Sequence, residues 1–150
     1  MDKKIKAIKT IIQELLEHLE VKATTSVSKG EEDTVVVQLE TDQPGVLIGY
    51  HGETLAAIQL IVSMIAYRKF SEWTRVLVNV GDYRERRKEV LERMALAVAE
   101  RAKFSGQSQA LPPMSAFERR IIHIVLASEP ELETVSEGEG KDRHVVIKPK

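Results

Sequence analysis

The sequence has 150 residues, a formal net charge of −1 and no cysteine. With 43% apolar and 30% charged residues, its composition is that of an ordinary soluble globular protein, and the absence of cysteine excludes disulfides, thiolate catalysis and Cys-ligated zinc. Because the charge is nearly neutral, any site for a polyanion must be local. We find no export signal and no run of about 18 apolar residues that could span a bilayer, so we expect a cytoplasmic protein.

The first half of the chain alternates helical and strand patterns. Apolar residues spaced three and four apart predict an amphipathic helix that ends near residue 20, and two β-branched segments around Gly30 predict a hairpin. A short helix then leads into the stretch "GVLIGYHGETL" at residues 45–55. The helix that follows runs to about Lys69, with its inward face predicted at Leu55, Ile58, Ile61, Val62 and Ile65. Alternation in "WTRVLVNVG" predicts a strand with one buried face.

The second half begins with a long helical pattern from Tyr83 to about Lys103, whose inward residues are predicted to be Val90, Leu91, Met94, Ala97 and Val98. A short strand closed by two prolines follows. Ser115 and Glu118 form a Ser-x-x-Glu capping box that predicts a helix through Leu126, and the chain closes with a hairpin. We therefore expect an α+β protein of two modules, residues 1–82 and 83–150.

Gly49 and Gly52 are separated by two residues at the junction of two predicted helices. Glycines there let the backbone turn sharply, and without Cβ atoms they would let a sugar-phosphate chain come close. The helix that begins near Glu53 offers N–H donors and partial positive charge to a phosphate. Taken alone, the motif is more typical of a plain connection between two helices.

Arg119 and His123 lie four residues apart in the last predicted helix. At 100° per residue, Phe117, Ile121 and Val125 cluster on the opposite side. We therefore expect Arg119 and His123 to face solvent together, either as an ordinary solvated face or as a cation and an imidazole that bind a phosphate or a base.

The phrase from Ile48 to Leu55, Ile-Gly-Tyr-His-Gly-x-x-Leu, resembles a K-homology (KH) domain of the bacterial type II topology. Arg-x-x-x-His, between "PPMSAFE" and "SEGEGKDRHVVI", resembles the R-three-H domain. The tandem, joined through "VGDYRERRKEVLERMA", resembles the Jag family, also called KhpB or SpoIIIJ-associated proteins. The resemblance covers nearly the whole chain and implies a KH type II module (helix-strand-strand-helix-helix-strand) followed by an R-three-H α+β module.

The resemblance implies binding of single-stranded nucleic acid, RNA rather than DNA by preference, by a non-catalytic regulator or RNA chaperone. A protein-interaction adaptor on the same scaffold is the alternative. Neither reading requires a cofactor, and the four scattered histidines form no paired metal site. The implied contacts are the turn Gly49, Tyr50, His51 and Gly52, the pair Arg119 and His123, and, by position and charge alone, Arg84 and Arg87, for which a solvated helix face is the alternative.

One departure concerns the turn itself. KH turns of this type commonly carry Lys or Arg between the glycines, whereas this sequence has Tyr50 and His51. We expect Tyr50 to compensate in part by stacking on a base, an interaction worth about 1–3 kcal/mol. His51 adds positive charge only in its protonated form.

Overall fold

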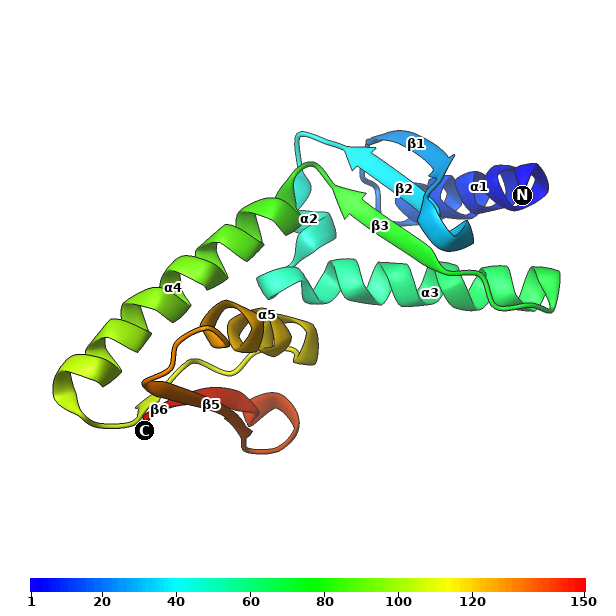
Figure 1. Ribbon diagram of the computed structural model, residues 1–150. Coiled ribbons are helices and arrows are strands. Elements are labelled where there is room, and N and C mark those ends of the chain that lie inside the picture. The colour runs from blue at the N-terminus through cyan, green and yellow to red at the C-terminus, as the bar shows by residue number, and fades with distance from the viewer. The chain divides into compact units, whose positions relative to one another are not determined.

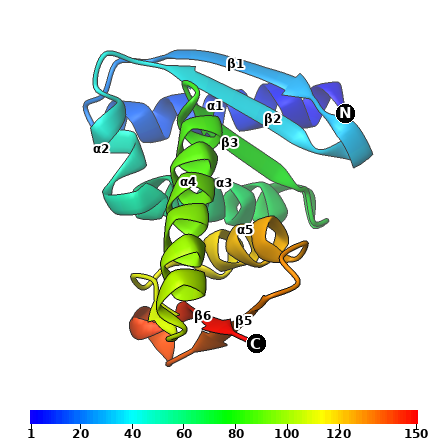
Figure 2. The same ribbon diagram turned by 60° about the vertical axis from the view of Figure 1, so that its left-hand side comes forward.

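The computed structural model describes residues 1–150. The chain forms two compact units, Met1–Arg84 (unit 1) and Glu85–Lys150 (unit 2), which Figures 1 and 2 show with most of their helices and strands labelled. Packing divides the chain in the first turn of helix α4, two residues beyond the boundary expected at residue 82. Each unit is described by itself below.

Unit 1 contains a three-stranded sheet and three helices. Its elements in chain order are α1 (Asp2–His18), β1 (Thr24–Lys29), β2 (Val35–Glu40), α2 (Pro44–Ile48), α3 (Glu53–Phe70) and β3 (Val76–Val80). The strand order is β1-β2-β3, with β1 antiparallel and β3 parallel to β2. This is the helix-strand-strand-helix-helix-strand order that the sequence predicts, so the α+β prediction for unit 1 is confirmed.

The core of unit 1 lies where α1 and α3 pack against the sheet. Alternate residues of β2 and β3 are buried, because successive side chains of a strand point to opposite faces. Ile8 and Ile12 of α1 and Val62 of α3 are fully buried against Val37 and Val78. Each such side chain contributes about 1.5–3 kcal/mol through burial of apolar surface.

The inward face of α3 differs from the prediction. Leu55, Ile58 and Val62 are buried as expected, whereas Ile61 is 43% exposed and Ile65 is 42% exposed. Because α3 is apolar on nearly all sides, periodicity alone could not select the face that meets the sheet.

The apolar character of α3 also corrects the expectation about membrane-spanning runs. The helical stretch Pro44–Phe70 is long and apolar enough to pass a length-and-composition test for a membrane span. The same test is passed by core helices of soluble proteins, and this stretch is interrupted by the turn Gly49–Gly52, where the chain leaves helical geometry.

Unit 2 is a smaller α+β module. Helix α4 (Tyr83–Ser105) enters it and is followed by β4 (Gln109–Ala110), α5 (Ala116–Leu126), β5 (Leu132–Glu137) and β6 (His144–Pro149). The strands form an antiparallel sheet in the order β4-β6-β5. Ser115 Oγ accepts a hydrogen bond from the Glu118 amide at 3.2 Å, so the predicted N-terminal cap of α5 is confirmed.

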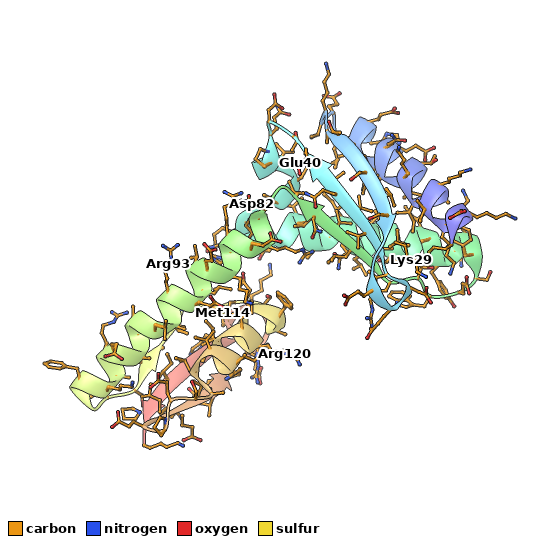
Figure 3. All side chains as sticks on the ribbon, turned by 45° about the horizontal axis from the view of Figure 1, so that its top comes forward. Lys29, Glu40, Asp82, Arg93, Met114 and Arg120 are labelled. Atoms are coloured by element: carbon orange, nitrogen blue, oxygen red, sulfur yellow. The ribbon has the colours of Figure 1, made fainter.

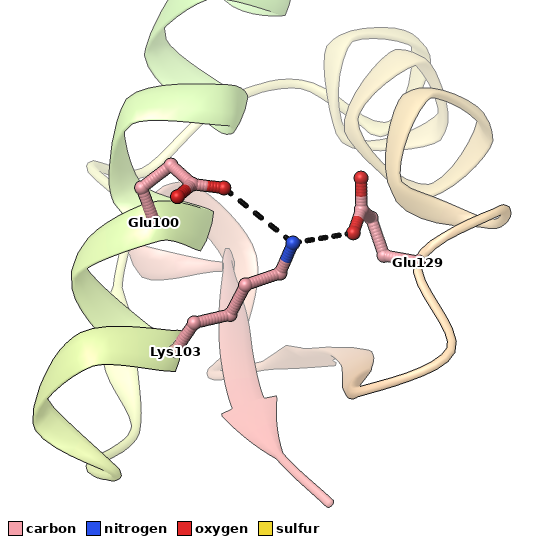
Figure 4. Close-up of polar contacts among 3 residues, drawn as sticks. All are labelled: Glu100, Lys103 and Glu129. Carbon is pink, nitrogen blue, oxygen red and sulfur yellow. Dashed lines mark hydrogen bonds and ion pairs between the residues drawn. The ribbon is translucent and has the colours of Figure 1, made fainter.

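Ion pairs connect α4 to the rest of unit 2. Lys103 Nζ lies 2.6 Å from Glu129 Oε2, beyond the end of α5, and 3.4 Å from Glu100 Oε1 on its own helix (Figure 4). Nearer the start of α4, Arg87 Nε donates to Glu118 Oε1 at 2.7 Å. The side chains of Arg87 and Glu118 are only 18% and 8% exposed, so this second pair is the more buried connection between α4 and α5.

The inward face of α5 agrees with the predicted apolar face only in part, because Ile121 and Val125 are partly buried against the core of unit 2. The residues actually buried are Glu118, Ile122 and Leu126, while Phe117 is 67% exposed. A carboxylate is acceptable on the inner row because Arg87 compensates its charge. In α4 the buried residues are Leu91, Ala95, Val98, Ala99 and Ala102, with Val90 and Ala97 exposed.

We predict that Glu118→Ala lowers the free energy of unfolding of unit 2 by about 2–3 kcal/mol, because it leaves the Arg87 guanidinium partly buried without its partner. Urea unfolding followed by circular dichroism measures the loss. Fluorescence of the only tryptophan, Trp73, reports on unit 1 separately.

Glu92→Ala is the matched control. Glu92 lies 3.8 Å from Lys88, and the side chains are 37% and 62% exposed, so its removal should cost less than about 1 kcal/mol. Equal losses from the two variants would contradict the structural role of the buried pair.

Candidate nucleic-acid interface

The turn between α2 and α3 has an unusual backbone. Gly49, His51 and Gly52 have positive φ angles of 69°, 50° and 83°. At Gly49 the accompanying ψ is −168°, a combination that is essentially restricted to glycine. His51 occupies the left-handed region, where histidine is among the residues better tolerated. Gly49 is therefore required by the path of the chain, and the left-handed backbone at residue 52 favours glycine.

The space that the missing Cβ atoms leave faces the protein. A Cβ at Gly49 would collide with Thr54 Oγ1, and one at Gly52 would lie 3.2 Å from Tyr83 Cε1. The sequence suggested that bare glycines admit a sugar-phosphate chain; the structure corrects this, because Thr54 and Tyr83 fill that space. The glycines instead allow a tight turn that packs on its own unit.

The outer side of the turn is open to solvent. Tyr50 is 72% exposed, and its ring stacks on that of His51 with centroids 3.9 Å apart. Within the turn, Gly49 N–H donates to Gly45 O and Glu53 N–H donates to Tyr50 O. The backbone N–H groups of Tyr50 and His51 are not donors in these two bonds. No side chain caps the N-terminus of α3, whose backbone partial charge there is positive.

The arginines at the start of α4 are already engaged by protein groups. Arg84 Nε donates to Asn79 Oδ1 at 3.1 Å, and its Nη2 donates to Gln59 Oε1 and Val78 O, each at 3.0 Å. Arg87 is paired with Glu118, as described above. Their sequence positions suggested solvent-facing cations, whereas the structure uses both guanidinium groups to satisfy acceptors of the protein.

Arg119 and His123 face the sheet of unit 2, and the expectation that they point together into solvent is wrong. Arg119 Nη1 donates to Ser136 Oγ at 3.0 Å. His123 Nδ1 lies 2.8 Å from Thr134 Oγ1, and His123 Nε2 lies 3.0 Å from Ser136 Oγ. The four side chains form a partly buried polar cluster between α5 and β5.

Sequence reasoning missed the two hydroxyl residues of this cluster. Leu132, Thr134 and Ser136 alternate along β5, and the first of them is buried. Period-two alternation puts all three side chains on the face that meets α5, so the alternation was the available signal. The prediction of a closing hairpin for this segment does not by itself distinguish the two faces of the strand.

The positive charge of this cluster is carried by Arg119 and not by His123. Burial, and secondarily the charge of Arg119, lower the pKa of His123 below its usual 6.5, so His123 is neutral near pH 7. A neutral imidazole has one donor and one acceptor nitrogen, which suits two hydroxyl partners. Arg119 Nε is buried without a hydrogen-bond partner.

Comparison with known proteins agrees with both motifs. The family model of the KhpA/KhpB KH domain matches residues 5–80, and that of the R-three-H domain matches residues 89–149. The RNA-binding protein KhpB of Bacillus subtilis is 31% identical over 148 residues, which are 97% of this chain and 71% of that protein. The chain belongs to the KhpB family.

Other KhpB relatives are longer than this chain. The RNA-binding protein KhpB of Clostridium symbiosum is 38% identical over 137 residues, which cover 91% of this chain and 62% of that protein. That of Streptococcus pneumoniae is 36% identical over 136 residues, which cover 91% of this chain and 41% of that protein. The chain thus spans less than two thirds of these two KhpB proteins, and the match includes the KH and R-three-H domains.

We predict that Gly49→Ala destabilises the KH unit by about 2 kcal/mol or more, because alanine must adopt a strained backbone and meet Thr54. The matched control is Gly45→Ala, where an added Cβ meets nothing within 4 Å. That change lies in α2 and should raise stability by up to about 1 kcal/mol. Thermal unfolding followed by Trp73 fluorescence compares the two; an unchanged midpoint for Gly49→Ala would refute the strained turn.

We predict that His123 titrates below pH 6.5 and that Arg119→Ala raises its pKa, because one of the two causes of the lowering is removed. The unfolded chain binds this proton more readily than the folded chain, so unit 2 loses stability as the pH falls below about 6.5. NMR titration of the imidazole protons measures the pKa. Arg120→Ala, an exposed neighbour on α5, should leave it nearly unchanged; a normal pKa in the parent would contradict the burial.

Proposed function

We propose that this chain binds single-stranded RNA without catalysing a reaction, as a cytoplasmic regulator or RNA chaperone. The observation that carries the proposal is the solvent-exposed Gly49–Gly52 turn, which displays an aromatic pair and main-chain amides at the uncapped start of α3. The printed names of the KhpB relatives, RNA-binding proteins, support it. The same chemistry accommodates single-stranded DNA, which binding measurements distinguish.

The turn suits one phosphate and one base. Amide donors and the start of a helix favour a phosphate, and the outer face of the Tyr50 ring, opposite His51, provides a stacking surface for a base. The turn carries no permanent cation, so its electrostatic contribution is small. We therefore propose modest affinity at unit 1.

Unit 2 supplies the permanent charge of the proposed interface. Arg119 lies in the α5–β5 cluster and is partly exposed. Its guanidinium can therefore bind a phosphate while it keeps its hydrogen bond to Ser136. Two weak sites on one chain raise the effective affinity through local concentration. Binding that depends on phosphates weakens as the salt concentration rises.

A second candidate function is a protein-interaction adaptor. It is favoured by the exposed apolar side chains of α3, where Leu60 is 56% and Met64 is 55% exposed. Contiguous apolar surface of this kind is typical of protein interfaces. An adaptor would bind neither RNA nor DNA with measurable affinity, which separates the two candidates.

Fluorescence anisotropy with labelled single-stranded RNA, single-stranded DNA and duplex RNA tests the proposal. We expect salt-sensitive binding to single strands and weaker binding to the duplex. In His51→Asp a negative charge replaces the imidazole at the proposed phosphate position, which should weaken binding about tenfold. In His51→Asn the new side chain has nearly the same shape as aspartate but no charge, and asparagine also tolerates the left-handed backbone. This variant should change the affinity far less.

The second site is tested by a charge-matched pair in the same titration. Arg119→Ala should weaken binding about tenfold, while Arg120→Ala, which removes the same charge from an exposed neighbour on α5 (Figure 3), should have a smaller effect. Equal affinities for His51→Asp and His51→Asn would remove the turn from the proposal. Equal affinities for the two alanine variants would remove Arg119.

A further inference from the structure

The outer edge of β3 is covered by side chains of its own unit. β3 pairs with β2 alone, which leaves its other edge with unpaired backbone groups. At Val78, in the middle of that edge, the N–H donates to Gln59 Oε1 and the C=O accepts from Arg84 Nη2, each at 3.0 Å. Gln59 comes from α3, which lies beside β3 in Figure 1.

The oxygen of Gln59 has no further capacity to accept hydrogen bonds. It accepts from Val78 N–H and from Arg84 Nη2, and a carbonyl oxygen has two lone pairs. Because both partners are donors, the carboxamide of Gln59 must turn its oxygen toward them, which leaves its Nε2 amino group on the other side. The Nε2 amino group takes no part in these bonds, so Gln59 presents donors only to any ligand at this edge.

Gln59 lies near the proposed phosphate position. It follows Glu53, the first residue of α3, by six positions, which is about 9 Å along the helix axis. A single strand held at the turn and running along α3 would bring a base to this edge. Asn79, whose Oδ1 accepts from Arg84 Nε, lies next to Val78 and is held by the same guanidinium.

We propose that Gln59 reads one base of the bound single strand through Nε2, favouring a base with a carbonyl oxygen at the contacted edge and disfavouring adenine. This inference rests on the proposed RNA-binding function. A glutamine that recognises adenine uses its oxygen and its amino group together, and here the oxygen is occupied. Adenine is the one common base without a carbonyl group.

Inosine in place of adenosine gives a matched probe, because it exchanges the 6-amino group for a carbonyl in the same ring system. The probes are labelled octa-adenosine RNA and the same RNA with one central inosine, and anisotropy gives the ratio of their affinities. For the wild-type chain we expect the inosine probe to bind about five- to tenfold tighter, the effect of one net hydrogen bond.

Gln59→Glu converts the outward donor into an acceptor while its inner oxygen keeps accepting from Val78 and Arg84. The added negative charge should weaken the binding of both probes equally. The ratio of the two affinities therefore isolates the contact between Gln59 and the base. We expect the preference for inosine to disappear or to invert toward adenosine, whose amino group is a donor. Gln13→Glu, the same exchange at an exposed position of α1, should keep the wild-type ratio.

Each outcome decides the inference. A wild-type ratio near one, or a Gln59→Glu ratio equal to that of Gln13→Glu, overturns base reading by Gln59 while leaving RNA binding intact. Failure of the wild-type chain to bind either probe or any other single strand overturns the proposed function, and this inference with it. Should Gln59→Glu not fold, the wild-type ratio still tests the preference.

Discussion

The left-handed backbone between α2 and α3 is the constraint on which the rest of unit 1 depends. Gly49 adopts a conformation that side chains exclude, and Gly52 turns the chain against Tyr83. Because Gly49 lacks a Cβ atom, Thr54 can pack beneath the turn and α3 can start four residues later. The intervening pair, Tyr50 and His51, is consequently displayed to solvent, where a ligand can reach it. The glycines at positions 49 and 52 are therefore explained by the backbone conformation of the turn and not by the close approach of a ligand.

In the proposed function the two units would contribute different chemistry to binding. The turn of unit 1 offers amides and aromatic surface, whereas the cluster of unit 2 offers one permanent cation, Arg119, beside a neutral His123. Hydroxyl partners on β5 orient both side chains, so little conformational entropy is left to lose when a ligand arrives. This division is compatible with the nearly neutral net charge of −1, since the proposed attraction of a polyanion would depend on a few groups rather than on the charge of the whole surface.

Several polar side chains that look alike in the sequence have distinct structural roles. Arg84 closes the exposed edge of β3, an arrangement that protects such edges from pairing with other chains, and in doing so it orients Gln59. Arg87 neutralises the buried Glu118. Because each guanidinium satisfies acceptors that would otherwise be left without donors, position in a basic stretch of helix is a poor guide to ligand contact.

Local patterns in the sequence were enough to predict the order of elements, both hairpins, the Ser115 cap and the two short motifs, since each depends on residues a few positions apart. The inward faces of α3 and α5 could be predicted only in part, because apolar side chains such as Ile61 and Phe117 also occur on the outer sides of these helices. Which side is buried depends on where the sheet lies. The partner of Arg119 is likewise Ser136, 17 residues away, and only the packing of α5 on β5 brings the two together.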